Sequence, residues 1–175
     1  MTAYLILIGL ICVERLGELV ISTRHATAMR ASGGVEHGAK HYPVMVALHA
    51  AFLAGCFLEP TLGDRPFVPL LGWPMLAVAA ATMALRWWCI ATLGEQWNTR
   101  VIVAPARSLI SSGPYRWLRH PNYVAVVLEG MALPLVHTAW LTATVFTVLN
   151  AALLTVRIRV ENAALTTSLP EAAHA

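Results

Sequence analysis

The strongest constraint on this chain is a series of five apolar stretches, each near the length that crosses a lipid bilayer. A transmembrane helix needs about 20 mostly apolar residues, within a range of about 17–25. The stretches cover residues 3–21, 43–59, 67–92, 121–137 and 139–157. Because lipid offers no partner for backbone N–H and C=O groups, we expect all five to be helices. The sequence therefore predicts an all-α, polytopic membrane helix bundle, a single domain over residues 1–175.

The composition excludes an ordinary soluble domain. Hydrophobic residues make up 58% of the chain and charged residues 12%, whereas soluble domains contain about 45–50% and about 25%. No basic residue precedes the first apolar stretch, so we expect a retained span and not a cleaved signal peptide. Cys12, Cys56 and Cys89 lie inside apolar stretches, and we expect them to be free thiols.

Lysine and arginine residues gather in the segments that one face of a five-span bundle would share. These residues are Arg24, Arg30, Lys40, Arg100, Arg107, Arg116, Arg119, Arg157 and Arg159. The connections on the opposite face hold Arg65. Cytoplasmic loops carry the excess of Lys and Arg, so we expect an inner-membrane protein with its N-terminus outside and its C-terminus in the cytoplasm. We expect no nucleic-acid partner, because the basic residues flank spans and do not form one soluble surface.

Several charged residues lie inside the apolar stretches, where they are costly unless they are paired or functional. Arg15 and Glu18 share a helix face, so we expect them to pair. Arg86 and Glu129 lie at matching depths in the third and fourth stretches, which predicts an ion pair between two helices. A small transporter or channel is an alternative function, in which these groups and His49 would line a path for a substrate or for protons.

Three histidines, His37, His41 and His49, fall at spacings that metal ligands can have. They lack cysteine or acidic partners at the usual spacing of a zinc site. We therefore expect no metal site.

The segment from Leu93 to Glu129 is much more polar than its flanks, and its core reads GPYRWLRHPNY over residues 113–123. Pro121 opens the fourth stretch, a position that proline favours in helices. The free N–H groups at such a helix start suit a carboxylate or a phosphate. A belt of aromatic and arginine side chains at the membrane interface would explain the Trp and Tyr residues. It explains less well the close run of Tyr, Arg, His, Pro and Asn.

This motif resembles the Gly-Pro-Tyr-Arg and Arg-His-Pro-x-Tyr elements of the isoprenylcysteine carboxyl methyltransferase family, membrane enzymes that use S-adenosylmethionine. The upstream LGEQW and the C-terminal RIRVENAAL are also similar to that family. The N-terminal ERLGELV and GGVEHGAKHYPVMVALH resemble a bacterial branch associated with type III polyketide synthases, whose acceptors are alkylpyrones or alkylresorcinols. The chain departs from the family at two positions: Ala125 replaces a glycine, and Glu161–Asn162 replaces a pair of glutamates.

The resemblance implies a cytoplasmic cofactor pocket built from residues 93–123 and 157–165. The expected cofactor-binding residues are Gln96, Trp97, Tyr115, Arg119, His120, Pro121, Tyr123 and Glu161. Among them, Trp97 or Tyr115 suits the adenine, and His120, Arg119 or the N–H groups near Pro121 suit the carboxylate of the cofactor.

Three residues are expected to act on the acceptor. Arg157 would fix an anionic oxygen of the acceptor, and Glu161 or His120 would act as a general base. The acceptor is expected to be a lipophilic small molecule that enters sideways from the membrane lipids. It stays open between an alkylpyrone or alkylresorcinol hydroxyl, a prenylcysteine-type carboxylate and a phospholipid amine. A nicotinamide-dependent membrane reductase on a similar helical frame is a further alternative.

Overall fold

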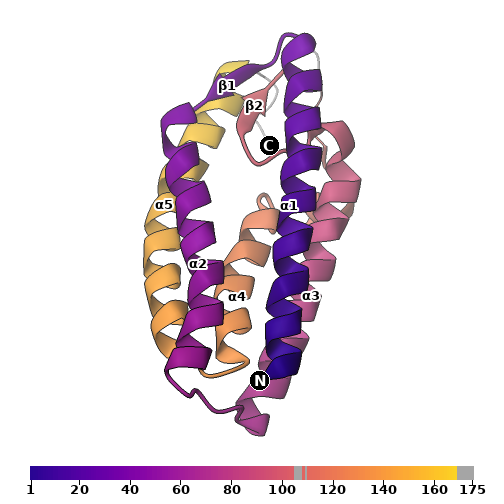
Figure 1. Cartoon of the computed structure of the whole chain (residues 1–175). Coiled ribbons are helices and arrows are strands. Elements are labelled where there is room, and N and C mark those ends of the chain that lie inside the picture. The colour runs from indigo at the N-terminus through magenta and orange to yellow at the C-terminus, as the bar shows by residue number, and fades with distance from the viewer. Residues whose placement is uncertain (105–107, 109, 169–175) are drawn as a thin grey trace.

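The structure is a computed structural model that describes residues 1–104, 108 and 110–168. Its five long helices are α1 (Thr2–Ala31), α2 (Tyr42–Leu62), α3 (Pro69–Leu93), α4 (Pro121–Leu135) and α5 (Trp140–Ser168). They run side by side along the length of the molecule (Figure 1). The predicted all-α membrane helix bundle is thereby confirmed. Arg107, one of the basic residues behind the predicted orientation, lies outside the described residues.

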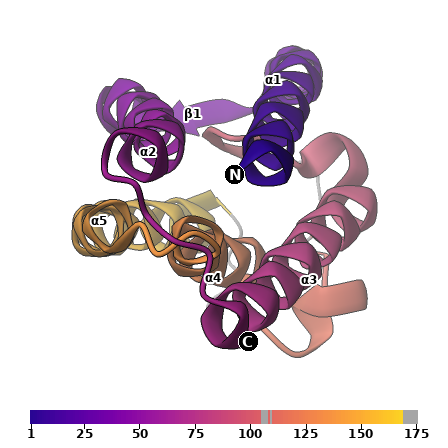
Figure 2. The ribbon, with the colours of Figure 1, turned by 60° about the horizontal axis from the view of Figure 1, so that its bottom comes forward.

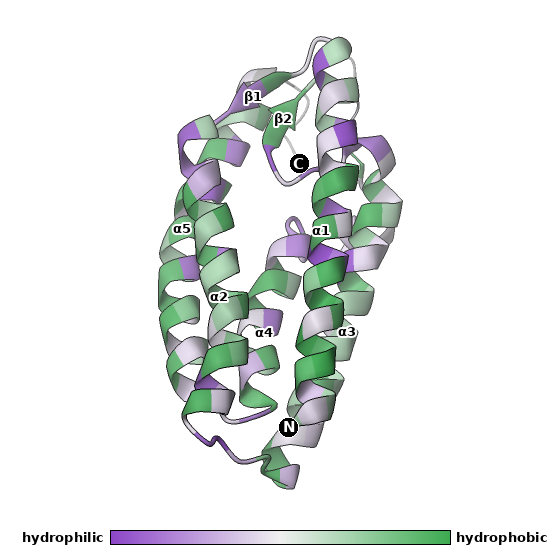
Figure 3. Ribbon diagram, in the orientation of Figure 1, coloured by the Kyte–Doolittle hydropathy of each residue, from purple (hydrophilic) through white to green (hydrophobic). Residues whose placement is uncertain are grey.

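Three helical segments are long and apolar enough to cross a membrane, within the part of the chain that the structure describes. They are Ala39–Leu62, Pro69–Gln96 and Trp140–Thr167. The apolar sequence of α1 is interrupted by Glu14, Arg15 and Glu18, and Figure 3 shows hydrophilic positions within this otherwise largely hydrophobic helix. The helix α4 has 15 residues and is therefore about 22 Å long, shorter than the bilayer core of about 30 Å.

Two helices extend well beyond the predicted stretches. The helix α1 continues to Ala31 and α5 to Ser168, whereas the apolar pattern ends near residues 21 and 157. A helix satisfies its own backbone hydrogen bonds in water as well as in lipid, so it need not end where the apolar residues end. The tight hairpin predicted at His137–Ala139 is confirmed, because α4 ends at Leu135 and α5 begins at Trp140.

The helices form two groups. In one group, α4 packs between α3 and α5. The other group, α1 and α2, lies on one side of this row, and α2 also packs on α5 (Figures 1 and 2). Gly130 allows the close approach of α4 to α5, because a Cβ atom there would lie 2.3 Å from Cε1 of Phe146. The buried apolar core lies beside this contact and includes Tyr4, Ile8, Ile11, Phe52, Cys56, Leu133, Val136 and Phe146.

A two-stranded antiparallel sheet joins two segments for which only loops were expected. The strand β1 (Val35–His37) pairs with β2 (Val101–Val103), with Val35 opposite Val103. Arg100 bonds Glu36 at 2.6 Å, and Arg30 pairs with the same carboxylate. Partial desolvation opposes this effect, but the two guanidinium groups hold the pKa of Glu36 below its ordinary value. We call this end of the bundle, opposite the N-terminus in Figure 1, the sheet end.

Candidate active site

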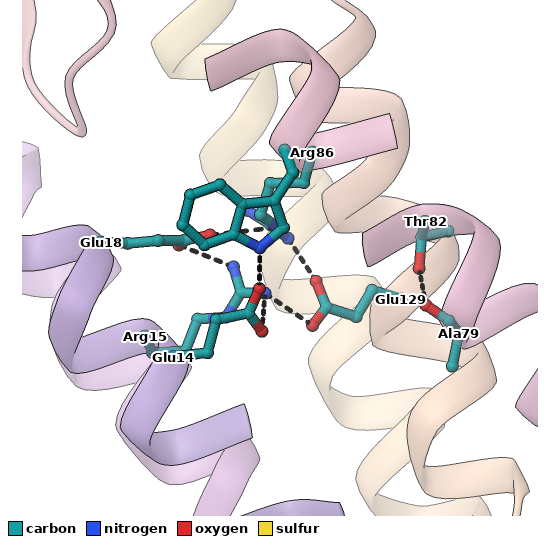
Figure 4. A network of polar contacts seen from close by, with 8 residues as sticks. Glu14, Arg15, Glu18, Ala79, Thr82, Arg86 and Glu129 are labelled. Atoms are coloured by element: carbon teal, nitrogen blue, oxygen red, sulfur yellow. Dashed lines mark hydrogen bonds and ion pairs between the residues drawn. The ribbon is translucent and has the colours of Figure 1, made fainter. Parts of the chain in front are cut away.

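A network of charged side chains crosses the middle of the bundle (Figure 4). Arg86 of α3 pairs with Glu129 of α4, and Arg15 of α1 bonds Glu18 at 2.7 Å. Both predicted pairs are therefore confirmed. Arg15 also lies 3.3 Å from Glu129 and 3.3 Å from Glu14. Because ion pairs in lipid have no water to compete with them, this network fixes α1 against α3 and α4.

A cavity of about 450 Å³ lies at the sheet end. Its walls come from the short 3₁₀ helices η2 (Gly94–Gln96) and η3 (Gly113–Arg116), from β2, from the start of α4 and from the end of α5. The predicted site residues that line it are Gln96, Trp97, Tyr115, Arg119, His120, Tyr123, Arg157 and Glu161. We call it the sheet-end cavity. Segments that are far apart in the sequence thus meet around one space.

Pro121 does not line this cavity. It is fully buried at the first position of α4. Its fixed φ angle and missing N–H group suit that position, so its contribution is to start the helix. Contact between Pro121 and a cofactor is therefore not supported.

Local contacts explain why the polar segment after α3 folds back onto the bundle. Ser22 Oγ of α1 lies 2.8 Å from Thr99 Oγ1 and accepts the Thr99 N–H at 2.8 Å. His25 donates Nδ1–H to the carbonyl of Trp97 at 2.7 Å. Gly113 has a φ of +57°, and a Cβ atom there would lie 2.5 Å from Thr92 Oγ1. Only glycine suits that turn, which brings η3 against the end of α3.

Four side chains in the sheet-end cavity form a connected polar chain. The Tyr123 hydroxyl donates to Glu161, and Arg157 donates its Nε–H to the Tyr123 oxygen at 2.8 Å. His120 stacks on the Tyr123 ring at 5.2 Å, and its Nδ1 lies 3.7 Å from Glu161 Oε1. Arg157 and Glu161 are four residues apart and share one face of α5, whereas His120 is the residue that directly precedes α4. The arrangement joins a carboxylate, a phenol and a buried guanidinium through successive hydrogen bonds.

Tyr115 faces the same cavity from η3. Burial raises the pKa of its phenol, and the neighbouring Cys89 thiol adds to this effect. The Tyr115 hydroxyl therefore stays protonated at physiological pH and acts as a neutral group in the cavity wall.

Two buried polar atoms in the cavity wall have no hydrogen-bond partner among the described residues. They are Trp97 Nε1 and Asn122 Oδ1. Trp97 is only 3% exposed. A buried donor or acceptor without a partner is costly, so such atoms mark places where a ligand can complete the site.

Sequence reasoning missed several polar residues of the sheet-end cavity. They are Asn98, Arg100, Ser108, Ser111, Asn122, Asn162 and Thr166. Two of them had a signal, because Asn122 occupies the variable position of the Arg-His-Pro-x-Tyr element and Asn162 replaces the second glutamate. The others become neighbours only when β2 and α5 come together, and no local sequence pattern predicts that contact.

A second, larger cavity of about 790 Å³ lies deeper in the bundle. Its walls come from α1 and α2 on one side and from α4 and α5 on the other, and most of its lining side chains are apolar. We call it the bundle cavity. The residues that line both cavities are Trp97, Asn98, Asn122, Tyr123 and Arg157. A shared wall of mostly polar side chains therefore lies between the sheet-end cavity and the bundle cavity, and the sheet-end cavity is the more polar of the two.

Comparisons with known proteins identify the family. A protein of Bacillus subtilis (strain 168), named "Uncharacterized protein YpbQ", is 35% identical over 161 residues, which cover 91% of this chain and 95% of that protein. An uncharacterized protein of Haemophilus influenzae is 28% identical over 160 residues, which cover 90% of this chain and 91% of that protein. Neither name states an acceptor. Residues 75–167, more than half of the chain, match the model of the isoprenylcysteine carboxyl methyltransferase family, and this membrane protein belongs to that family.

Proposed function

We propose that this protein is an S-adenosylmethionine-dependent O-methyltransferase that acts on a lipid-like acceptor at the sheet end. Methyltransferases of the family use S-adenosylmethionine generally. The observation that carries the proposal is the shared wall between the two cavities. A polar cofactor on one side of Tyr123 and Arg157 and an apolar acceptor on the other would meet there.

The residues of the sheet-end cavity fit the cofactor. A volume of about 450 Å³ is within the range of about 300–1,000 Å³ for small-molecule sites. The unpartnered Trp97 Nε1 and Asn122 Oδ1 offer one donor and one acceptor. His120 and Arg119 would hold the carboxylate of the cofactor, and Glu161 its ribose hydroxyls. When bound, the cofactor supplies an electrophilic methyl group.

The bundle cavity fits the acceptor. Its apolar walls would hold an alkyl or prenyl tail, whose transfer from lipid requires no loss of apolar contact. Arg157 is 6% exposed and lines both cavities, so its guanidinium would bind the oxygen that is methylated. That oxygen belongs to an alkylpyrone or alkylresorcinol hydroxyl or to a prenylcysteine-type carboxylate.

A hydroxyl acceptor also requires removal of a proton. Glu161 does not line the bundle cavity, whereas Tyr123 does and donates its hydroxyl to Glu161. We therefore assign Glu161 as a base that acts through Tyr123. The acceptor proton passes to the Tyr123 oxygen while the Tyr123 proton passes to Glu161 Oε2. A carboxylate acceptor is already ionised and needs no such step.

We place the protein in the inner membrane, with its sheet end facing the cytoplasm. Basic side chains gather at this end, whereas Arg65 at the opposite end pairs with Glu59 at 3.1 Å. This asymmetry is typical of a cytoplasmic face. The cavity would then open toward the compartment that contains the cofactor.

Calorimetry with S-adenosylhomocysteine tests the proposal. Purified protein in detergent should bind about one molecule per chain, and Trp97→Phe should weaken binding because it removes the unpartnered donor. A nicotinamide cofactor titrated in parallel separates the reductase alternative. Absence of heat with S-adenosylhomocysteine at high protein concentration would overturn the proposed function.

The transporter alternative is tested in the same preparation. Arg86 and Glu129, the residues that such a path would use, are bonded to each other and to α1. This favours a structural role. Proton or solute uptake by liposomes that contain the protein, together with no cofactor binding, would support a transporter instead.

A further inference from the structure

The bundle cavity contains two buried oxygen atoms that accept no hydrogen bond from any residue that the structure describes. They are Glu18 Oε1 on α1 and Asn150 Oδ1 on α5. Glu18 is 4% exposed and Asn150 is 2% exposed, and both residues line the cavity. Two hydrogen-bond acceptors thus line a mostly apolar space from two different helices. Arg15 and Arg86 line the same cavity near Glu18, and their Nε atoms also lack a partner among the described residues. A buried acceptor without a partner is destabilising, so such a pair calls for an explanation.

These two oxygens lie away from the wall where methyl transfer is proposed. Asn150 and Arg157 both face the bundle cavity and are seven residues apart on α5, which corresponds to about 10 Å along the helix. Glu18 lies one helical turn from Ser22, which bonds Thr99 near the sheet end. Asn150 is therefore about two helical turns from Arg157, on the side away from the sheet end (Figure 1).

The charge of Glu18 is already balanced, which limits the chemistry that it can accept. Its Oε2 atom bonds Arg15 at 2.7 Å, and its Oε1 atom lies 3.8 Å from Arg86 Nε (Figure 4). The second distance is too long for a hydrogen bond. Arg86 Nε is itself a buried donor without a partner among the described residues, so a small side-chain shift would pair it with Glu18 Oε1. Asn150 is neutral, and its Oδ1 atom lacks a hydrogen-bond donor and not a counter-charge. A neutral hydroxyl supplies such a donor, whereas an ammonium group would also have to lie beside Arg15 and Arg86.

We propose that the acceptor is a hydroxylated lipid, with a second hydroxyl about 10 Å from the methylated atom that donates its one hydrogen bond to Asn150 Oδ1. The inference rests on the proposed function, because it takes the bundle cavity as the acceptor site. The hydroxyl determines specificity. In the bilayer core it would have no partner, whereas in this cavity it meets the free acceptor Asn150 Oδ1, so it favours entry into the protein.

A matched series of alkylphenols tests this subsite. All members have the same phenol and the same tail length; one has no further hydroxyl, one has a hydroxyl about 10 Å from the phenol oxygen, and one has it at the end of the tail. Binding of each radiolabelled lipid to the protein in nanodiscs gives its Kd. The wild type should bind the second lipid about tenfold tighter than the first, the effect of one net hydrogen bond, and tighter than the third.

Variants assign the effect to Asn150. Asn150→Leu removes the acceptor with a side chain of similar branching, and the ratio of the two Kd values should fall to about one. Thr155→Val is the matched control on the same helix, because Thr155 is exposed and bonds the carbonyl of Ala151. This control should keep the ratio. A wild-type protein that binds all three lipids equally, or an Asn150→Leu variant that keeps the preference, would overturn the proposal.

Methyl transfer to the same lipids separates this inference from the proposed function. Preferential binding of the hydroxylated lipid without methylation of any lipid would contradict the proposed function and still support the subsite. Equal binding, together with methylation of all three lipids, would contradict the subsite and leave the proposed function intact. Water that fills the cavity and satisfies Glu18 and Asn150 would give equal binding, so it belongs to the second result. The wild-type comparison decides between these outcomes even if Asn150→Leu does not fold.

Discussion

Replacement of Tyr123 by phenylalanine separates the two kinds of acceptor. The change removes one oxygen, and with it the hydrogen bonds to Glu161 and Arg157. Hydrogen bonds to charged groups contribute about 1.5–3 kcal/mol each. Loss of both corresponds to about 3–6 kcal/mol, or a fall in kcat/KM of about 10²- to 10⁴-fold. For a hydroxyl acceptor we expect the whole effect, because the proton path is broken.

A carboxylate acceptor has no proton to lose. For it, Tyr123→Phe affects only the positioning of Arg157, and we expect a fall of about 10- to 100-fold. The assay is transfer of a radiolabelled methyl group to an alkylresorcinol and to a prenylcysteine-type acid. If the protein methylates only the hydroxyl compound, the two acceptors cannot be compared. The pH dependence of methyl transfer to that compound is then measured for the wild type and for Tyr123→Phe. Activity of the variant should then rise at alkaline pH, where the acceptor ionises without help.

Tyr4→Phe is the control for this experiment. Tyr4 is buried at the end opposite the sheet, where its hydroxyl donates to the carbonyl of Leu133 at 3.2 Å. The same atom is removed from a buried tyrosine, with the loss of one hydrogen bond to a neutral carbonyl, about 0.5–1.5 kcal/mol, and no change in the transfer step is expected. If Tyr123→Phe lowers both acceptors equally, or leaves the hydroxyl acceptor unaffected, then the role of Tyr123 in proton transfer is wrong.

Three further predictions concern the fold. Arg86→Gln removes the nearer of the two cations that pair with buried Glu129 and leaves Arg15 at 3.3 Å. Thermal unfolding in detergent should show a loss of at most about 3–5 kcal/mol, the range for a buried charge left without any partner, and an unchanged unfolding midpoint would mean that the network does not hold the helices. Gly130→Ala forces a Cβ atom against Phe146, so the same assay should show a loss of stability of about 1–3 kcal/mol. No loss would mean that α5 can move away from α4 without cost. The pKa of Glu36 is lowered by folding, so its stabilising effect is present above its unfolded pKa of about 4.3 and is lost as the pH falls through the lower folded value. The thermal unfolding midpoint should therefore differ less between pH 7 and acidic pH in Glu36→Gln than in the wild type. The same difference in both proteins would contradict the prediction.

Much of the architecture follows from the sequence, because hydrophobic length is a local property. Each of the five apolar stretches lies largely within one helix, and the hairpin at His137–Ala139 leaves no room for anything but a tight turn. The pair Arg86–Glu129 was also predictable, since two opposite charges at one depth in lipid have few other partners. The motif at residues 113–123 indicated the family before any contact was known.

The tertiary structure alone decided how the polar segments meet. The strands β1 and β2 are three residues long, too short for an alternating pattern, and they pair across more than sixty positions of sequence. The family resemblance implied that residues 93–123 and 157–165 form one pocket, but not that Asn98 would line it or that Pro121 would be buried outside it. The unpartnered oxygen of Asn150 is likewise invisible in the sequence. Helices form from contacts within one segment, whereas a cavity and its free hydrogen-bonding atoms exist only where several segments pack together, and the local pattern does not encode that packing.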